Sequence, residues 1–347
     1  MVTKEREKRV TLRDVSRSAG VSPMTVSNVV RGDHHLVKLE TRAKVEEAIA
    51  RLNYRPNLSA RSLRLSRASS IGILISDTNP AFLTDPFISR LVSGLSNYLS
   101  ELDFTLDVQG VSPERFESAT ILSKAGNDAL CVILCGPKRL RRRHVEHLVR
   151  MDQPVIIFQE NNLPHSNNIC LLSQDDFEGG SLIGRHLADK EVRSLLFVRP
   201  KLDWVAVEQR ERGLRFALGH SGSEINIETI MTPSEDFEDV HQAVKDYLSR
   251  STPDAIVGAT DVLGAAALKA CADLKIAVPE TTLVTGFNGF DVWCYTTPNL
   301  TTVMSPAYEM GRQAGQLLLA RLKDGVFSER NTVFPVSLQI GASTEAQ

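Results

Sequence analysis

The chain has 347 residues, of which 42% are hydrophobic and 24% charged, a composition that excludes a wholly disordered protein. This length is enough for two or three domains of roughly 100–200 residues each. Apolar runs stay below the roughly 18 residues of a membrane-spanning helix, and the charged segment 1–9 does not resemble a secretion signal. We therefore expect a cytoplasmic protein.

The five cysteines are odd in number and scattered through apolar segments. We expect them to be reduced core residues, as is usual in the cytoplasm. No His or Cys follows the first two at the spacing of a zinc site, so the sequence predicts neither a metal nor another cofactor. The cysteines are Cys131, Cys135, Cys170, Cys271 and Cys294.

The net charge of −2 combines two segments of opposite charge. Residues 1–68 hold 15 Lys and Arg against 7 Asp and Glu, a net charge of +8, whereas the remainder holds 25 against 35. A basic head on an acidic body indicates that the head binds a polyanion and the body does not. A solvated basic tail would have the same charge, so the pattern within the head must decide.

The basic head contains the signals of two short helices joined by a tight turn. Thr11 is suited to cap the first helix, Asp14 to close a capping box, and Gly20 to end the helix. Ser22 and Pro23 start a second helix at once, because serine caps helices and proline at the first helical position loses no hydrogen bond.

A third helix is predicted over about residues 40–52, and this arrangement is typical of a helix-turn-helix. Val26, Val29 and Val30 form the apolar side of the second helix. The polar residues of its first turn would then meet base edges in a major groove of DNA. A small helical protein-interaction domain is the alternative, and the charge of +8 and the glycine turn make it less favourable.

Two segments, TLRDVSRSAGVSPMTVSNVVRG and TRAKVEEAIARLNYRPNLSARSLR, resemble the DNA-binding head and hinge of the lactose-repressor (LacI/GalR) transcription regulators. The resemblance covers nearly all of residues 10–65. It implies a disordered tail at 1–9, a helix-turn-helix domain at 10–56, a hinge helix and linker at 57–68, and a two-lobe effector-binding and dimerisation domain at 69–347.

The resemblance also implies which residues contact DNA. Phosphate contacts fall to Thr11, Ser22 and Ser27, and base-reading positions to Pro23, Met24 and Asn28. The remaining DNA-binding positions, three of them on the hinge, are Thr25, Tyr54, Asn57, Ala60 and Leu63.

Two features of the head depart from the family pattern or extend it. Pro23 and Met24 offer no paired hydrogen-bond donors, so the operator half-site cannot be copied from a relative, and Lys38 stands where a capping serine is common.

The hinge at 57–64 is too short to be a stable helix alone and can become ordered on DNA. Leu63 would then act as an apolar wedge in a minor-groove step.

From Ser70 onward, β-rich runs alternate with helical stretches. Buried strands between helices imply parallel sheets in doubly wound α/β units, and eight or more strands suit two lobes rather than one sheet. A closed eight-fold barrel is the alternative, and the resemblance to the family favours two lobes. The body resembles the periplasmic-binding-protein-like effector domain, whose chain crosses between lobes three times, here expected near Ser173, Leu300 and Asn331. The predicted strands are Ile71–Ser76, Phe104–Gln109, Leu130–Cys135, Val155–Phe158, Ile169–Leu172, Leu195–Val198, Ala255–Ala259 and Leu283–Phe287.

The body contains no enzyme motif: GxxxxGK[ST], GxSxG and HExxH are all missing, so we do not expect catalysis. Gly179-Gly180-Ser181 at a helix start is only a weak phosphate-binding signal. The basic run 141–144 is expected on an exposed helix start, as solvated surface rather than a second nucleic-acid site. His34, His144 and His220 are expected at the surface.

Ligand contacts are expected in the cleft, at the carboxyl ends of parallel strands. Arg210, three residues before Gly213, matches the effector-binding arginine of the family, with a surface pair to Glu208 or Glu211 as the alternative. Trp204 is a further aromatic candidate. Hydroxyl-rich ligands need paired donors and acceptors beside aromatic faces. The other predicted effector-binding residues are Asp77, Phe87, Gln159, Thr260, Asp261, Asn288 and Trp293.

We therefore expect a homodimeric DNA-binding transcription repressor whose operator affinity is controlled by a small effector, with a sugar or sugar derivative first. No leucine heptad follows the last lobe, so the sequence predicts a dimer reading two half-sites and not a coiled-coil tetramer. The alternatives are a regulator with a purine-like corepressor, a partner-dependent global regulator, a sugar-binding transport protein and an α/β enzyme.

Overall fold

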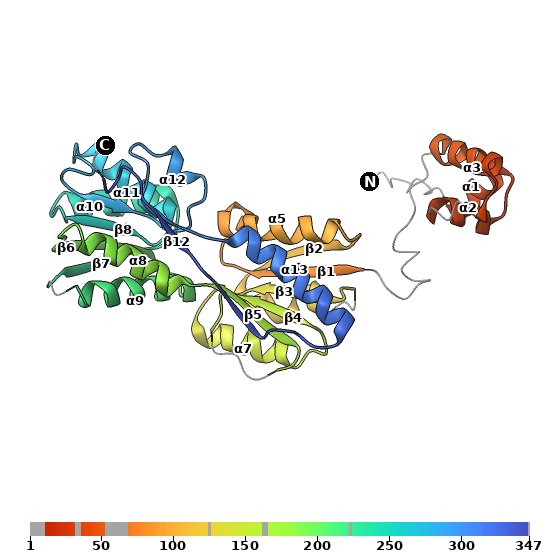
Figure 1. The fold of residues 1–347 in the computed structure, drawn as a ribbon, viewed down its shortest axis with the longest axis horizontal. Coiled ribbons are helices and arrows are strands. Elements are labelled where there is room, and N and C mark those ends of the chain that lie inside the picture. The colour runs from red at the N-terminus through yellow and green to blue at the C-terminus, as the bar shows by residue number, and fades with distance from the viewer. Residues whose placement is uncertain are drawn as a thin grey trace, which may run out of the picture. The chain divides into compact units, whose positions relative to one another are not determined.

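The computed structural model describes residues 11–31, 36–52, 69–123, 126–161, 166–221 and 224–345 (Figure 1). The chain divides into two compact units, Met1–Ala68 and Ser69–Gln347, which we call the head and the body. Each unit has a hydrophobic core of its own. The finer division of the first 68 residues into tail, domain and hinge stays a prediction.

Three helices form the head: α1 (Leu12–Ala19), α2 (Pro23–Arg31) and α3 (Leu39–Arg51). The predicted capping box is confirmed, because the Thr11 N–H donates to Asp14 at 2.9 Å and the Asp14 N–H donates to the Thr11 hydroxyl at 3.3 Å. Gly20 ends α1 in the left-handed conformation, at φ 64°. Lys38 provides no side-chain cap for α3, as expected from its place in the sequence.

The head is held together by a small aliphatic core. Val15 of α1, Val26 and Val29 of α2, and Val45 and Ala48 of α3 are buried against one another. Because these residues recur at helical spacing, each helix has one inner face and one outer face. The outer face of α2 is thereby left to its polar residues.

The first lobe of the body is a parallel sheet in the order β11-β5-β4-β3-β1-β2. Helices α5 (Pro86–Ser100) and α13 (Ala307–Asp324) cover one face, and α7 (Lys138–Val149) covers the other (Figure 1). Short turns η2 (Phe82–Thr84), η3 (Pro113–Ser118) and α6 (Thr120–Ser123) connect them. The strands are β1 (Ser70–Ser76), β2 (Thr105–Val111), β3 (Ala129–Ile133), β4 (Val155–Phe158), β5 (Ile169–Gln174) and β11 (Asn331–Phe334).

The second lobe is a parallel sheet in the order β7-β6-β8-β9, with a two-stranded antiparallel ribbon of β10 and β12. The strands are β6 (Ser194–Pro200), β7 (Asn226–Thr232), β8 (Ala255–Gly258), β9 (Leu283–Thr285), β10 (Thr302–Met304) and β12 (Ser337–Gln339). The helices are α8 (Asp176–Ala188), α9 (Val205–Gly219), α10 (Phe237–Leu248), α11 (Asp261–Asp273) and α12 (Val292–Tyr295).

The two open sheets confirm the doubly wound two-lobe body and exclude the closed barrel. The chain passes between the lobes from β5 to α8, from β10 to α13 and from β11 to β12 (Figure 1). The crossing predicted near Ser173 therefore follows directly after that residue. The other two were predicted too early, because Leu300 is buried in the core of the second lobe and Asn331 begins β11 of the first.

The basic run 141–144 is only partly exposed, since Arg142 and Arg143 are exposed as predicted and the other two residues are not. It lies within α7, and Arg141 and His144 are 6% and 2% exposed. The reason is helical spacing, since these two side chains share the inner face of α7 with Val145 and Leu148. His220 is exposed as expected, whereas His34 lies outside the described residues.

Cys294 is a second correction, because it is exposed while the other four cysteines are buried. It lies in α12, a short surface helix, and donates to the Asp291 carbonyl at 3.0 Å.

Among the described residues, no helix is long and apolar enough to cross a membrane.

Helices α8 and α9 pack through glycines on both sides. A Cβ atom added to Gly180 would collide with the carbonyl oxygen of Arg210, and one added to Gly213 would collide with that of Phe177. Gly179 leaves room for the ring of Phe287 in the same way. The two adjacent glycines of α8 therefore serve close packing: Gly180 lets α8 approach α9, and Gly179 lets α8 approach the ring of Phe287.

We predict that Gly213→Ala destabilises the body by about 1–3 kcal/mol, because the added methyl group forces the two helices apart. Gly219→Ala, in the same helix but with open space around its Cβ position, is the control and should leave stability unchanged or raise it by up to about 1 kcal/mol. Urea unfolding monitored by circular dichroism measures both. Equal effects of the two substitutions would contradict the close packing.

Candidate functional site

The first two turns of α2 present an accessible face of apolar and polar side chains away from the core of the head. Val26 and Val29 are buried, whereas Met24 is 65% exposed and Asn28 is partly exposed. The Ser22 hydroxyl accepts from the Thr25 N–H at 3.1 Å and fixes the start of the helix. The structure therefore brings the predicted contact residues of α2 onto one accessible surface.

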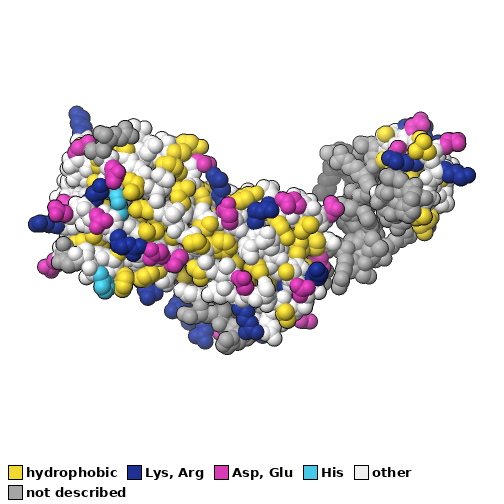
Figure 2. All heavy atoms as spheres, in the orientation of Figure 1, with side chains coloured by type: hydrophobic (Ala, Val, Ile, Leu, Met, Phe, Trp, Pro, Cys, Tyr) yellow, Lys and Arg dark blue, Asp and Glu magenta, His cyan; other side chains and the backbone are white. Residues whose placement is uncertain are grey.

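The remaining predicted DNA contacts are divided by what the structure describes. Thr11 and Pro23 are exposed, and Ser27 is partly exposed. Tyr54, Asn57, Ala60 and Leu63 lie outside the described residues, so the predicted hinge contacts stay predictions. On the face of the body shown in Figure 2, positive and negative side chains are interspersed and form no basic patch.

The body contains a cavity of about 680 Å³ between its two lobes. It lies at the carboxyl ends of the strands of both sheets, where doubly wound folds bind ligands. Eight predicted residues line it: Asp77, Phe87, Gln159, Trp204, Arg210, Thr260, Asp261 and Asn288.

Trp293 does not line the cavity, contrary to the prediction. It is partly buried against the core of the second lobe, and its carbonyl oxygen accepts from the Leu300 N–H at 2.9 Å. Sequence analysis missed Asp85 and Glu235, which do line the cavity. Asp85 precedes Pro86 and caps α5, a signal present in the sequence, whereas Glu235 follows β7, a strand that the sequence did not reveal.

Arg210 lies within α9, where its side chain is buried. It is 5% exposed, and its Nε donates to Asp176 Oδ1 at 2.8 Å. Its two terminal nitrogens donate to the Ala259 carbonyl at 2.7 Å and to Asn288 Oδ1 at 3.1 Å. The guanidinium carbon lies 3.8 Å from the centre of the Phe287 ring. These contacts exclude the alternative of a surface pair.

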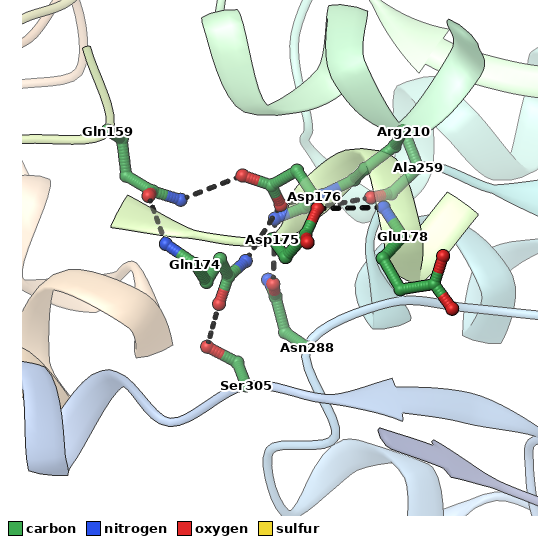
Figure 3. A network of polar contacts seen from close by, with 9 residues as sticks. All are labelled: Gln159, Gln174, Asp175, Asp176, Glu178, Arg210, Ala259, Asn288 and Ser305. Carbon is green, nitrogen blue, oxygen red and sulfur yellow. Dashed lines mark hydrogen bonds and ion pairs between the residues drawn. The ribbon is translucent and has the colours of Figure 1, made fainter. Parts of the chain in front are cut away.

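Asp176 extends this network across the lobes, as Figure 3 shows. Its Oδ2 accepts from Gln159 of the first lobe at 3.0 Å, and its Oδ1 accepts from Gln174 at 2.8 Å. Gln174 in turn accepts from the Ser305 hydroxyl at 2.5 Å. Because Gln174 and Ser305 lie at two of the three crossings, the Arg210–Asp176 pair is connected to the segments that join the lobes.

Two residues of this network have strained backbones. The backbones of Gln159 and Asn288 are in the left-handed region, at φ 56° and φ 110°. Residues other than glycine seldom adopt this region. Such strain persists where surrounding contacts hold it, and it is frequent at binding sites. Here the side chains of both residues are held by hydrogen bonds to Asp176 and Arg210.

Carboxyl groups of both lobes line the cavity, and burial raises their pKa values. The pKa of Glu235 rises to about 8, from burial and then from the charge of Asp85. Burial raises the pKa of Asp261 to about 6, and it raises the pKa values of Asp77 and Asp85 as well. Perturbed carboxyls in a cleft are typical of a functional site.

Three contacts join the lobes around the cavity. Arg90 of α5 donates to both carboxylate oxygens of Asp291 at 2.9 Å. On the other side Arg141 donates to the Asp203 carbonyl at 2.5 Å, and the Trp204 indole N–H donates to Cys135 Sγ at 3.1 Å. The described conformation is therefore one in which the lobes touch.

We predict that Arg210→Met destabilises the body by about 3–5 kcal/mol, because it leaves the buried Asp176 carboxylate without its partner. Asp176→Asn should cost a similar amount, and the double variant should cost less than the sum of the two. Chemical denaturation of the four proteins gives the coupling. Additive costs would show that the pair is not coupled, and Arg215→Met, at an exposed pair, is the control.

Two family models match this chain. The model of bacterial regulatory proteins of the lacI family matches residues 11–57, which span the three helices of the head. The model of the periplasmic binding protein-like domain matches residues 185–344, which hold the second-lobe wall of the cavity and α13. Each match falls on the unit whose geometry it describes.

Whole proteins of the same type are similar over nearly the full chain. The ribose operon repressor of Escherichia coli (strain K12) is 28% identical over 338 residues, 96% of this chain and 99% of that protein. The HTH-type transcriptional repressor PurR of Aliivibrio salmonicida (strain LFI1238) is 26% identical over 318 residues, 90% of this chain and 92% of that protein.

A solved structure has the same fold. The lac repressor dimer bound to operator and the anti-inducer ONPF matches with a TM-score of 0.82 and 24% identity, over 98% of this chain and 100% of that one. The helix-turn-helix head, the two-lobe body and the two family models agree. The chain therefore contains a DNA-binding domain of the lacI family of bacterial regulatory proteins and a periplasmic binding protein-like domain.

Proposed function

We propose that this chain is a cytoplasmic transcriptional repressor, which binds a pseudo-palindromic operator as a homodimer through α2 of its head. The observation that carries the proposal is the accessible face of α2, on which Met24 is exposed and Asn28 partly exposed above a core of Val26 and Val29. A short capped helix with this surface fits the major groove. The similarity to the ribose operon repressor and to the operator-bound lac repressor dimer supports it.

The cavity in the body is proposed to hold the effector. Its wall combines polar groups that can pair with hydroxyls and aromatic side chains that can stack on a ring, among them Phe87, Trp204 and Phe290. An effector controls operator affinity only if it binds two arrangements of the body with different affinity. The network from Arg210 to the crossings provides a path for that difference.

A sugar or sugar derivative is the first effector class, supported by the similarity to the ribose operon repressor. A purine is the second, and two observations favour it: the aromatic wall at Phe87 and Trp204, and the similarity to PurR. The sign of the response distinguishes an inducer, which weakens operator binding, from a corepressor, which strengthens it.

We predict that Asn28→Ala changes base preference at one symmetric pair of operator positions, by about 1–3 kcal/mol per base pair. Selection of binding sites from random DNA by the wild type and the variant measures this. Lys44→Gln, on the exposed side of α3, should return the wild-type consensus. An unchanged consensus for Asn28→Ala would reject the base-reading role, and a change without a symmetric partner would contradict the dimer.

The effector class is tested by thermal unfolding with pentoses, hexoses and purine bases, each with and without the selected operator DNA. We expect a sugar to raise the unfolding midpoint of the body and to change operator affinity in a parallel anisotropy titration. A purine that does so instead would replace the sugar. Stabilisation without any change in operator affinity would contradict effector control.

A further inference from the structure

The cavity wall holds many more carboxyl groups than cations. Among the described residues that line it, Asp77, Asp85, Glu235, Asp236 and Asp261 are acidic, and Arg210 is the one Lys or Arg side chain. The charge of Arg210 is already balanced by Asp176 at 2.8 Å. A ligand that enters this cavity therefore meets acidic groups in excess over basic ones.

Some of these carboxyls have structural roles that occupy their oxygens. Asp85 accepts from the N–H groups of Phe87 and Ile88 and caps α5. Asp236 caps α10 in the same way, accepting from two backbone N–H groups. These carboxylates are stabilised by helix starts without help from a ligand.

Glu235 and Asp261, both of the second lobe, are not satisfied in this manner. Glu235 accepts a 3.3 Å hydrogen bond from the Thr260 hydroxyl at one carboxyl oxygen. Asp261 is 3% exposed, and although its Oδ1 accepts from Thr302, its Oδ2 has no hydrogen-bond partner among the described residues. Because Asp261 Oδ2 is closed to solvent, a ligand in the cavity does not reach it, whereas the partly exposed Glu235 can accept a hydrogen bond from a ligand.

The aromatic side chains of the wall suit the same kind of donor. Phe87, Trp204 and Phe290 line the cavity beside these carboxyls. Aromatic faces attract cations, and a carboxylate pairs with an ammonium through short, charge-assisted hydrogen bonds. A phosphate or carboxylate ligand would face repulsion from the same wall, and Arg210 has no unbalanced charge to offset it.

We propose that the effector of this chain is a small hydroxylated molecule with a protonated amine, whose ammonium group lies against Glu235. The proposal rests on the proposed function, because it takes the cavity as the effector site. It narrows the first effector class from sugars in general to aminated sugars. The ammonium supplies Glu235 with charge-assisted donors beyond the Thr260 hydroxyl, and the hydroxyls are left for Gln159, Thr260 and Asn288.

Calorimetric titration with matched ligands tests the charge. The probes are the 2-amino, 2-hydroxy, N-acetylated and 6-phosphorylated forms of glucose and galactose, which are cationic, neutral, neutral and anionic in that order. We expect the free amines to bind at least about tenfold more tightly than their other forms, the size of one charge-assisted contact. Equal or tighter binding of a neutral or phosphorylated form, or no binding of any amine, overturns the proposal.

Variants locate the ammonium. Glu235→Gln should weaken amine binding by at least about tenfold, and Glu235→Asp should restore part of it. Glu238→Gln is the matched control, because this substitution removes the same charge from a side chain that is 80% exposed and lies outside the cavity. Equal amine affinity for Glu235→Gln and wild type overturns the assignment.

The two levels of the proposal fail separately. Operator binding by the unliganded wild type, measured by anisotropy on the same preparation, tests the proposed function and does not involve an amine. If operator binding is found and the amine preference is not, the repressor stands and the charge of its effector is wrong. If neither the operator nor a ligand is bound, the proposed function fails.

Discussion

The buried pair between Arg210 and Asp176 is the interaction on which the body depends. A guanidinium and a carboxylate removed from water are costly unless each is fully paired. Here Arg210 also donates to Ala259 and Asn288, and Asp176 also accepts from Gln174, which completes the pairing. The glycine contacts of α8 and α9 serve the same end, since they bring the two helices that hold the pair close enough to form it. The ion pair between Arg210 and Asp176 therefore depends on the close packing of α8 on α9.

The head achieves its surface by the opposite means. Its core is aliphatic and small. The helix caps and the glycine turn therefore contribute much to fixing the positions of the helices. What it exposes is defined by what it buries, because Val26 and Val29 turn the first turn of α2 outward. A change in the core would thus move the outer residues without altering any of them.

Much of this organisation could be predicted from the sequence, and the errors have physical causes. The strongly apolar strands and the capping box are local signals, and both were found. Strand β7 was missed because its alternation of polar and apolar residues marks a sheet edge, and Arg141 was misplaced because a charge run hides a helical period. Of the cavity residues, Glu235 could not be placed without β7, and Trp293 looked like a ligand platform only because aromatic residues serve both cores and sites.

The contact between Trp204 and Cys135 gives the molecule an optical property. The chain has two tryptophans, and the other, Trp293, is packed against the second lobe alone. The indole of Trp204 instead touches a thiol of the opposite lobe, and thiols quench indole emission on contact. Separation of the lobes would therefore increase the fluorescence of Trp204 while leaving that of Trp293 unchanged. The intrinsic tryptophan fluorescence of the chain then follows the movement of the lobes without an added label.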